Sequence, residues 1–135
     1  MSAATTVTQF LELLASERAA EAAELLSPGI EWRNSGWPTI RGARVGAMLR
    51  DMDRRHIRFA VTFHHVAEEE RADGASIVLT ERTDLIGFRR WSTSFWVCGT
   101  FRVDDGLITL WDDHFSTGSV LLGAVKGLRG LVPGR

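Results

Sequence analysis

Cysteine is almost absent from this chain, because Cys98 is the only one in 135 residues. One cysteine forms no intramolecular disulfide and supplies no four-cysteine zinc motif, so we expect a reducing compartment, the cytoplasm. Cys98 lies in the apolar run Phe-Trp-Val-Cys-Gly, residues 95–99. A buried, unreactive thiol is a better interpretation of this position than a nucleophile, so the sequence does not support thiol chemistry.

An excess of charge and a long apolar run are also missing. The 16 lysine and arginine residues nearly balance the 17 aspartate and glutamate residues, which gives no reason to expect nucleic acid or a membrane surface as a partner. No apolar stretch approaches the ~20 residues of a membrane-spanning helix. The start of the chain lacks the basic and then apolar pattern of a signal peptide. By length we expect a single domain, residues 1–135.

Apolar residues at helical spacing dominate the first part of the chain. Val7, Phe10, Leu11 and Leu14 follow the i, i+3, i+4, i+7 pattern of an amphipathic helix. Capping and stop signals bound this helix and two others. We expect helices at residues 7–15 with a capping box at 6–9, at residues 19–26 between Ser16 and Ser27-Pro28-Gly29, and at residues 45–55.

Patterns typical of strands dominate the remainder. Apolar and polar residues alternate in residues 57–64, as expected for a half-buried strand. We expect strands at 30–34, 57–64, 76–86, 92–103 and 107–115, a turn at 68–74, a tight hairpin at 104–106 and a helix in the tail, 116–131. Helices followed by an antiparallel meander predict an α+β domain with the helices on one face of the sheet.

Two of these strands carry acidic residues and an arginine. Arg82 and Asp84 are two residues apart, so their side chains share one face of a strand. Asp112 and Asp113 are adjacent and point to opposite faces, and alternation alone leaves open which one faces a pocket. An arginine between two carboxyl groups can keep one ionised while the other retains its proton, which supplies a base and an acid at one pH. The alternative is an ordinary salt bridge at Arg82.

The histidines and aromatic residues are less specific. His64 and His65 face opposite ways on a strand and cannot bind one metal ion together, so no metal site is expected. An apolar pocket would draw on the same aromatic residues as an ordinary core. The candidates for the pocket wall are Trp32, Trp37, Phe95, Trp96 and Trp111.

Three runs, residues 78–84, 95–101 and 105–115, closely resemble the limonene-1,2-epoxide hydrolase family in order and spacing, in particular its actinobacterial branch. They carry an Arg-x-Asp element at Arg82 and a Trp-x-Asp element that ends at Asp113. Residues 31–34 and 40–42 also resemble the family's first strand and the segment after it. The resemblance implies a cone-like curved mixed sheet with helices packed on it, the nuclear transport factor 2-like or SnoaL-like fold, usually as a homodimer.

The resemblance also implies one-step hydrolysis of an apolar, cyclic or terpenoid-like epoxide to a vicinal diol, without metal, cofactor or covalent intermediate. By this resemblance Asp113 is the general base for the attacking water, Asp84 protonates the epoxide oxygen, Arg82 bridges them, and Asn34 helps to hold the water. Family members commonly use a tyrosine beside this asparagine. The chain has no tyrosine, and Trp32, which donates but cannot accept a hydrogen bond, stands at the matching place.

Two other functions stay open at this point. An isomerase or cyclase of the same fold would use one aspartate to move a proton beside a carbonyl group, which a dienone-forming assay would detect. A non-catalytic dimeric module would bind apolar ligands without turnover. Fold alone does not separate these functions, so the residues that line the pocket decide between them.

Overall fold

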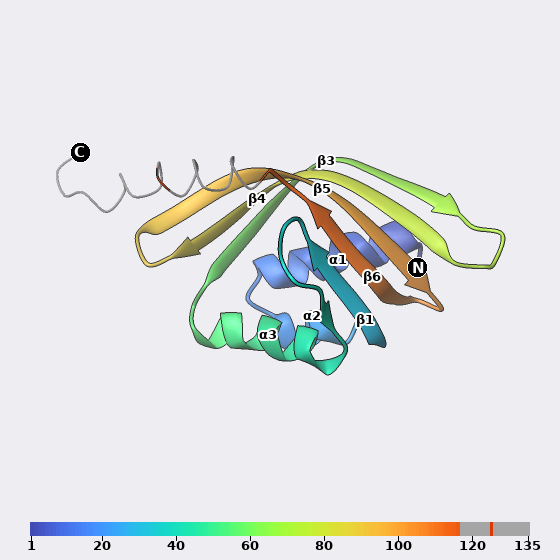
Figure 1. The fold of residues 1–135 in the computed structure, drawn as a ribbon, viewed down its shortest axis with the longest axis horizontal. Coiled ribbons are helices and arrows are strands. Elements are labelled where there is room, and N and C mark those ends of the chain that lie inside the picture. The colour runs from blue at the N-terminus through green and yellow to red at the C-terminus, as the bar shows by residue number, and fades with distance from the viewer. Residues whose placement is uncertain (117–124, 126–135) are drawn as a thin grey trace.

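The frame of the molecule is a strongly curved six-stranded sheet (Figure 1). The structure is a computed structural model that describes residues 1–116 and 125. Its strands are β1 (Leu26–Asn34), β2 (Ile40–Arg41), β3 (Arg58–Glu70), β4 (Ser76–Phe88), β5 (Trp91–Asp104) and β6 (Leu107–His114). They are ordered β2-β1-β6-β5-β4-β3. β3 to β6 form the expected antiparallel meander, and β1 pairs in parallel with β6, so the sheet is mixed.

Three helices lie on the concave side of this sheet (Figure 1). They are α1 (Ala3–Ala15), α2 (Ala19–Ala23) and α3 (Ala43–Arg54). This arrangement confirms the prediction of an α+β fold with the helices on one face. In the described residues, no helix is long and apolar enough to cross a membrane.

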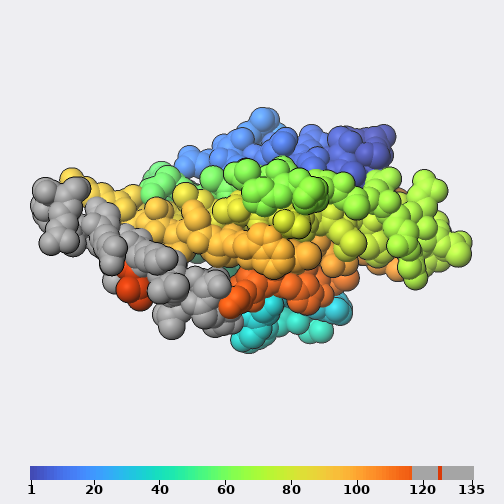
Figure 2. All heavy atoms as spheres, turned by 90° about the horizontal axis from the view of Figure 1, so that it is seen from above, coloured from blue at the N-terminus to red at the C-terminus, as the bar shows by residue number. Residues whose placement is uncertain are grey.

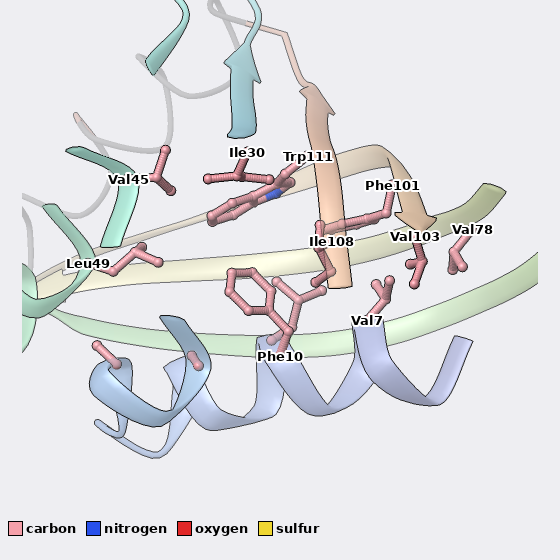
Figure 3. Packing of buried hydrophobic residues seen from close by; sticks show 13 residues of the cluster. Val7, Phe10, Ile30, Val45, Leu49, Val78, Phe101, Val103, Ile108 and Trp111 are labelled. Atoms are coloured by element: carbon pink, nitrogen blue, oxygen red, sulfur yellow. The ribbon is translucent and has the colours of Figure 1, made fainter. Parts of the chain in front are cut away.

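The core lies between α1 and the inner face of the sheet (Figure 3). Val7, Phe10 and Leu11 on α1 are fully buried, in agreement with the helical spacing of the apolar residues. The ring of Phe10 meets the indole of Trp111 on β6 edge to face, with centroids 5.0 Å apart. Each such side chain contributes roughly 1.5–3 kcal/mol to folding by leaving water, so α1 is held to the sheet mainly by these contacts.

The predicted hairpin between β5 and β6 is confirmed. Asp105 and Gly106 both have positive φ, 50° and 79°, the backbone conformation of the two-residue turn that suits the twist of paired strands. The predicted start of the turn at residues 68–74 is wrong. β3 continues through Glu70, and the turn is closed by Arg71 N–H donating to the Ala75 carbonyl at 2.7 Å. Glu68–Glu70 remain in the strand because they pair with Val78, Ile77 and Ser76 of β4.

The predicted start of the first helix is wrong. α1 begins at Ala3, with Ser2 as its N-cap, and the hydroxyl of Ser2 accepts a hydrogen bond from Thr5 N–H at 3.1 Å. Thr6, the predicted cap, lies inside the helix and is 1% exposed. Its hydroxyl donates to the Ser2 carbonyl at 3.2 Å, and Ala3 and Ala4 are strong helix formers that extend the helix by a further turn.

The predicted second helix is too long and its cap is wrong. α2 ends at Ala23, and its N-cap residue Arg18 makes no side-chain capping bond. Asp53 on α3 accepts a hydrogen bond from Ala19 N–H at 2.8 Å instead. Residues 27–29 do not form a stop but belong to β1, in the stretch where its pairing with β6 shifts register. Proline is tolerated at such an irregularity because a ladder hydrogen bond is already missing there.

Cys98 lies on the convex, outer face of the sheet and is exposed. The prediction of a buried thiol is therefore wrong, since Phe95, Val97 and Gly99 are the residues of this run that face inward. Figure 2 views this outer face, where side chains of β4 to β6, coloured yellow to orange, form much of the surface. The helix predicted for residues 116–131 lies almost entirely outside the described residues.

Candidate active site

Arg82, Asp84 and Asp113 meet on the concave face of the sheet. Arg82 and Asp84 are on β4, and Asp113 is on β6. Their exposed fractions are 0%, 4% and 5%, which is rare for charged residues unless they are paired. Asp112, on the opposite face, pairs with His114 on the outside of the sheet at 3.3 Å. The pairing of β1 with β6 places Asn34 directly beside Asp113.

The guanidinium of Arg82 is the centre of this cluster. Its Nε and Nη2 donate to Oδ1 and Oδ2 of Asp84 at 2.8 and 3.0 Å, a bidentate pair. Nη2 also donates to Oδ2 of Asp113 at 2.7 Å, and Nη1 donates to the hydroxyl of Thr80 at 3.0 Å. Such charge-assisted bonds are short and directional. The arginine therefore holds the two carboxyl groups in fixed positions relative to one another.

Burial dominates the titration of both acids. It raises the pKa of Asp113 and of Asp84 above the ordinary aspartate value, because a carboxylate loses its hydration in the interior, and Arg82 opposes this increase in each case. The charge of Asp84 raises the pKa of Asp113 further. Burial acts to lower the pKa of Arg82, but the two carboxylates outweigh it and the pKa is raised. Arg82 therefore stays charged, and it stabilises the ionised form of both acids.

A cavity of about 140 Å³ opens beside the two acids. Asn34, Asp53, Asp84 and Asp113 are its polar or charged lining residues. The other described lining residues are apolar and lie on α1, on α3, on the strands or directly next to them: Leu14, Trp32, Leu49, Met52, Ile57, Phe59, Ile86, Phe95, Trp111 and Phe115. An apolar space with a few polar groups at one end is typical of a small-molecule site.

Several polar atoms around the cavity have no hydrogen-bond partner in the described residues. They are the indole nitrogens of Trp32 and Trp111 and Oδ1 of Asp113, all buried from solvent. The Trp111 indole lowers the pKa of Asp113 slightly, yet its N–H makes no hydrogen bond of ordinary geometry. Buried donors and acceptors without partners are costly in an interior, and in native proteins they are found at catalytic sites and where water or a ligand binds.

Three of the five aromatic residues predicted for the pocket wall, Trp32, Phe95 and Trp111, line the cavity. The prediction for the other two is wrong for this cavity, because Trp37 and Trp96 are 66% and 53% exposed. Trp96 alternates outward on β5, and Trp37 lies in the loop between β1 and β2.

Three groups of the site were not predicted from the sequence. Thr80 shares the inner face with Arg82, and the period of two along β4 was a signal that could have found it. Asp53 lies on α3 and reaches the cavity from the helical layer. The apolar lining from Leu14, Leu49 and Met52 appears only when helices and sheet are assembled.

The matches with known proteins agree with this geometry. The family model described as the limonene-1,2-epoxide hydrolase catalytic domain matches residues 1–126. The chain belongs to the limonene-1,2-epoxide hydrolase family. Epoxide hydrolase EphG of Mycobacterium tuberculosis is 40% identical to it over 127 residues, which cover 93% of this chain and 81% of that protein.

Several solved structures share the fold of this member of the limonene-1,2-epoxide hydrolase family. An M. tuberculosis epoxide hydrolase described as LEH-like has a TM-score of 0.84 and 39% identity, and the match covers 94% of this chain and 92% of the other. A putative polyketide cyclase of Pseudomonas putida has a TM-score of 0.69 at 13% identity, with 92% and 98% covered. Proteins described as NTF2-like also match. The expected NTF2-like fold is confirmed, and these more distant neighbours share the fold alone.

Proposed function

We propose that this protein hydrolyses a small apolar epoxide to a vicinal diol by general acid and base catalysis on a bound water molecule. The observation that carries the proposal is the bridge from Arg82 to two buried carboxyl groups at the polar end of an apolar cavity. An epoxide oxygen is a poor leaving group until it is protonated, and water is a poor nucleophile until it loses a proton. The chemistry therefore needs an acid and a base together.

The charge of the cluster supports this pair of roles. One cation and two carboxylates would leave a net negative charge in a nearly dry interior, which is costly. A proton retained by one of the acids makes the cluster neutral and gives one neutral and one ionised carboxyl group. The direction of both pKa shifts, upward through burial, favours the retained proton.

We assign the base to Asp113 and the acid to Asp84, the roles that the resemblance to the family implies. Arg82 contacts both oxygens of Asp84 but only Oδ2 of Asp113, so no donor of the described residues occupies Oδ1 of Asp113, and we propose Oδ1 as the atom that takes the proton of the water. In the reaction, the water oxygen bonds to an epoxide carbon, the bond from that carbon to the epoxide oxygen breaks, and the epoxide oxygen receives the proton of Asp84. Asp113 gains the proton that the water loses, so the number of protons on the pair is unchanged after each turnover.

Two further residues hold the water in this proposal. Asn34 lies beside Asp113 in the pairing of β1 with β6, and its side-chain carbonyl accepts a hydrogen bond from the water. The indole N–H of Trp32, which is buried and has no partner among the described residues, donates a hydrogen bond to a lone pair of the water. With its protons directed to Asp113 and Asn34 and one lone pair bound, the water keeps one lone pair for attack.

The cavity supports a small, apolar substrate. Its volume of about 140 Å³ is close to that of a cavity of ~150 Å³ that accommodates benzene. A cyclic epoxide about as large as benzene fits this cavity. A terpenoid epoxide is larger and would require the lining side chains to move. We expect cyclohexene oxide and styrene oxide to be turned over at lower KM than limonene oxide.

The deciding experiment is diol formation from these epoxides by the wild type, the variant Asp113→Asn and the control Asp112→Asn. Asp112 neighbours the proposed base but faces outward. Diol from the wild type and the control, with none above the buffer rate from Asp113→Asn, supports the proposal. Equal rates in all samples would contradict it and leave an isomerase, a cyclase or a binding module to be tested.

Isotope labelling separates direct attack by water from a covalent route. In a single turnover in 18O-labelled water, direct attack places the label in the first diol formed. An ester intermediate on Asp113 would first release diol with an unlabelled oxygen from the carboxylate. Unlabelled diol in that turnover would rule out the one-step mechanism.

We also propose a homodimer formed through the outer face of the sheet and a cytoplasmic location. Leu79 and Trp96 are exposed on that face, and large apolar side chains on an open sheet face favour association. The exposed thiol of Cys98 suits a reducing compartment. Light scattering of the wild type and of Trp96→Arg tests the dimer, which the substitution is expected to weaken.

A further inference from the structure

Gly99 lies on β5, between the strand that carries Arg82 and the strand that carries Asp113. The register places Thr80, Gly99 and Asp113 side by side on β4, β5 and β6. Neighbouring strands are about 4.8 Å apart, so the backbones of β4 and β6 are separated by roughly 10 Å. The side chain of Arg82 must therefore cross the inner face of β5 to reach Asp113.

The space above Gly99 is filled by atoms of the site. A β-carbon at this position would lie 2.5 Å from Arg82 Nη1, 2.8 Å from Asp113 Oδ1 and 2.8 Å from Thr80 Oγ1. Packed atoms do not approach this closely, so the neighbours would have to move. Arg82 cannot yield as a surface arginine does, because it is fully buried and bonded to Asp84, Asp113 and Thr80.

The backbone at position 99 does not itself require glycine. Gly99 lacks the positive φ that favours glycine, which in the described chain is found at Gly36, Gly42, Gly74 and Gly106. A glycine inside a strand weakens the strand and often marks a close approach of other groups. The geometry points to Gly99 as a positioning residue, whose missing side chain leaves the passage through which Arg82 holds Asp113.

This role rests on the proposed function, and it predicts a specific kinetic defect for Gly99→Ala. The added methyl group forces Arg82 and Asp113 apart, so Asp113 loses the opposite charge beside it and takes up a proton more readily. The loss of one charge-assisted hydrogen bond changes a rate or equilibrium constant by about 10- to 100-fold. We expect kcat to fall by that factor with little change in KM, and the acidic limb of the pH–rate profile to move to higher pH.

Gly87 on β4 provides a matched control. A β-carbon there would also meet an arginine, 2.5 Å from Arg58 Nη2. Arg58 is exposed and donates to the carbonyl of Arg89, outside the cavity lining, so it can move at little cost. Gly87→Ala is expected to keep the wild-type kcat and pH–rate profile. An equal loss in the two variants would overturn the positioning role, because it would be a general effect of a strand glycine.

Thermal unfolding tests the positioning role separately from turnover. The decrease in Tm caused by Gly99→Ala should be larger at pH 8 than at pH 5, because the unpaired Asp113 is charged in the unfolded chain and resists charging in the folded one. The decrease caused by Gly87→Ala should be the same at both pH values. If the wild type turns over no epoxide, the proposed function fails but this difference still supports the positioning role. An equal decrease at both pH values for Gly99→Ala overturns it.

A variant that does not fold is also informative. If Gly99→Ala is insoluble, adding Thr80→Ala removes one of the crowding atoms and lets Arg82 retract toward β4. The double variant is expected to fold, by circular dichroism, without recovering the wild-type kcat. Failure of the double variant to fold overturns the inference, because crowding by these atoms would then not explain the glycine.

Discussion

Trp32 and Trp111 are stacked across the parallel pair of β1 and β6, with ring centroids 4.2 Å apart and ring planes 10° apart. The register that sets Trp32 opposite Trp111 also sets Asn34 opposite Asp113. The stack holds the indole of Trp32 beside the acidic cluster, and Phe10 in turn holds Trp111 from the helical layer. The side chains that we propose to hold the water are therefore fixed by packing, which is what efficient positioning requires.

Replacement of Trp32 by phenylalanine keeps an aromatic ring in the stack and removes the N–H group. We expect kcat to fall about 10-fold, which is the worth of one hydrogen bond, with a smaller change in KM. Steady-state diol formation from cyclohexene oxide measures the effect. Trp37→Phe, at an exposed indole, is the control and should retain the wild-type kcat. A wild-type kcat in Trp32→Phe would mean that the water is held without this donor.

Replacement of Arg82 by methionine should destabilise the fold in a pH-dependent way. Removing the arginine leaves two carboxyl groups without their cation in the interior, which costs about 3–5 kcal/mol when they are charged. Below the raised pKa values of Asp84 and Asp113 both groups can protonate in the folded state. The loss in free energy of unfolding, measured by urea titration, should be larger at pH 8 than at pH 5. A loss independent of pH would contradict the charge argument.

Asp113→Asn should separate activity from stability. General base catalysis contributes about 10²- to 10⁴-fold, so diol formation should fall by that factor. The pKa of Asp113 is raised in the folded state, so the folded protein binds more protons than the unfolded chain above the ordinary aspartate pKa. Wild-type stability then decreases as pH rises through the raised pKa. The variant should have an equal or higher Tm than the wild type at pH 8, by calorimetry; a much lower Tm would count against this assignment.

The pH–rate profile of the wild type should be bell-shaped. At low pH both acids are protonated and the base is lost, and at high pH both are ionised and the acid is lost. Because burial raises both pKa values, the acidic limb should lie above the ordinary aspartate value. A rate of diol formation that stays constant from pH 4 to pH 9 would exclude this acid and base pair.

Phe115→Ala should widen the substrate range. Phe115 lines the cavity and its ring contacts Phe95, with centroids 5.7 Å apart. Removal of the ring enlarges the cavity on its apolar side and leaves the hydrogen bonds of Arg82 in place. We expect kcat/KM for limonene oxide to rise relative to cyclohexene oxide, measured with both epoxides in competition. An unchanged ratio would show that another part of the wall limits substrate size.

Much of the architecture could be predicted because its signals are local. The β-rich composition of residues 76–86, 92–103 and 107–115 predicted three long strands, and the structure keeps all of them with ends that differ by at most two residues. The shared face of Arg82 and Asp84 is likewise a property of one strand. The errors came where tertiary contacts replaced local signals, as when Asp53 on α3 caps α2 in place of Ser16.

The sequence by itself determined that an arginine and an aspartate lie on one strand face and that one of two adjacent aspartates can join them. Only the tertiary structure decided that Asp113 faces inward and Asp112 outward, because the pairing of β6 with β5 and β1 fixes which side of the strand meets the core. The tertiary structure also decided that Gly99 lies under the bridge from Arg82. Side-chain alternation is local, whereas the register between strands distant in sequence depends on how the whole sheet packs against its helices.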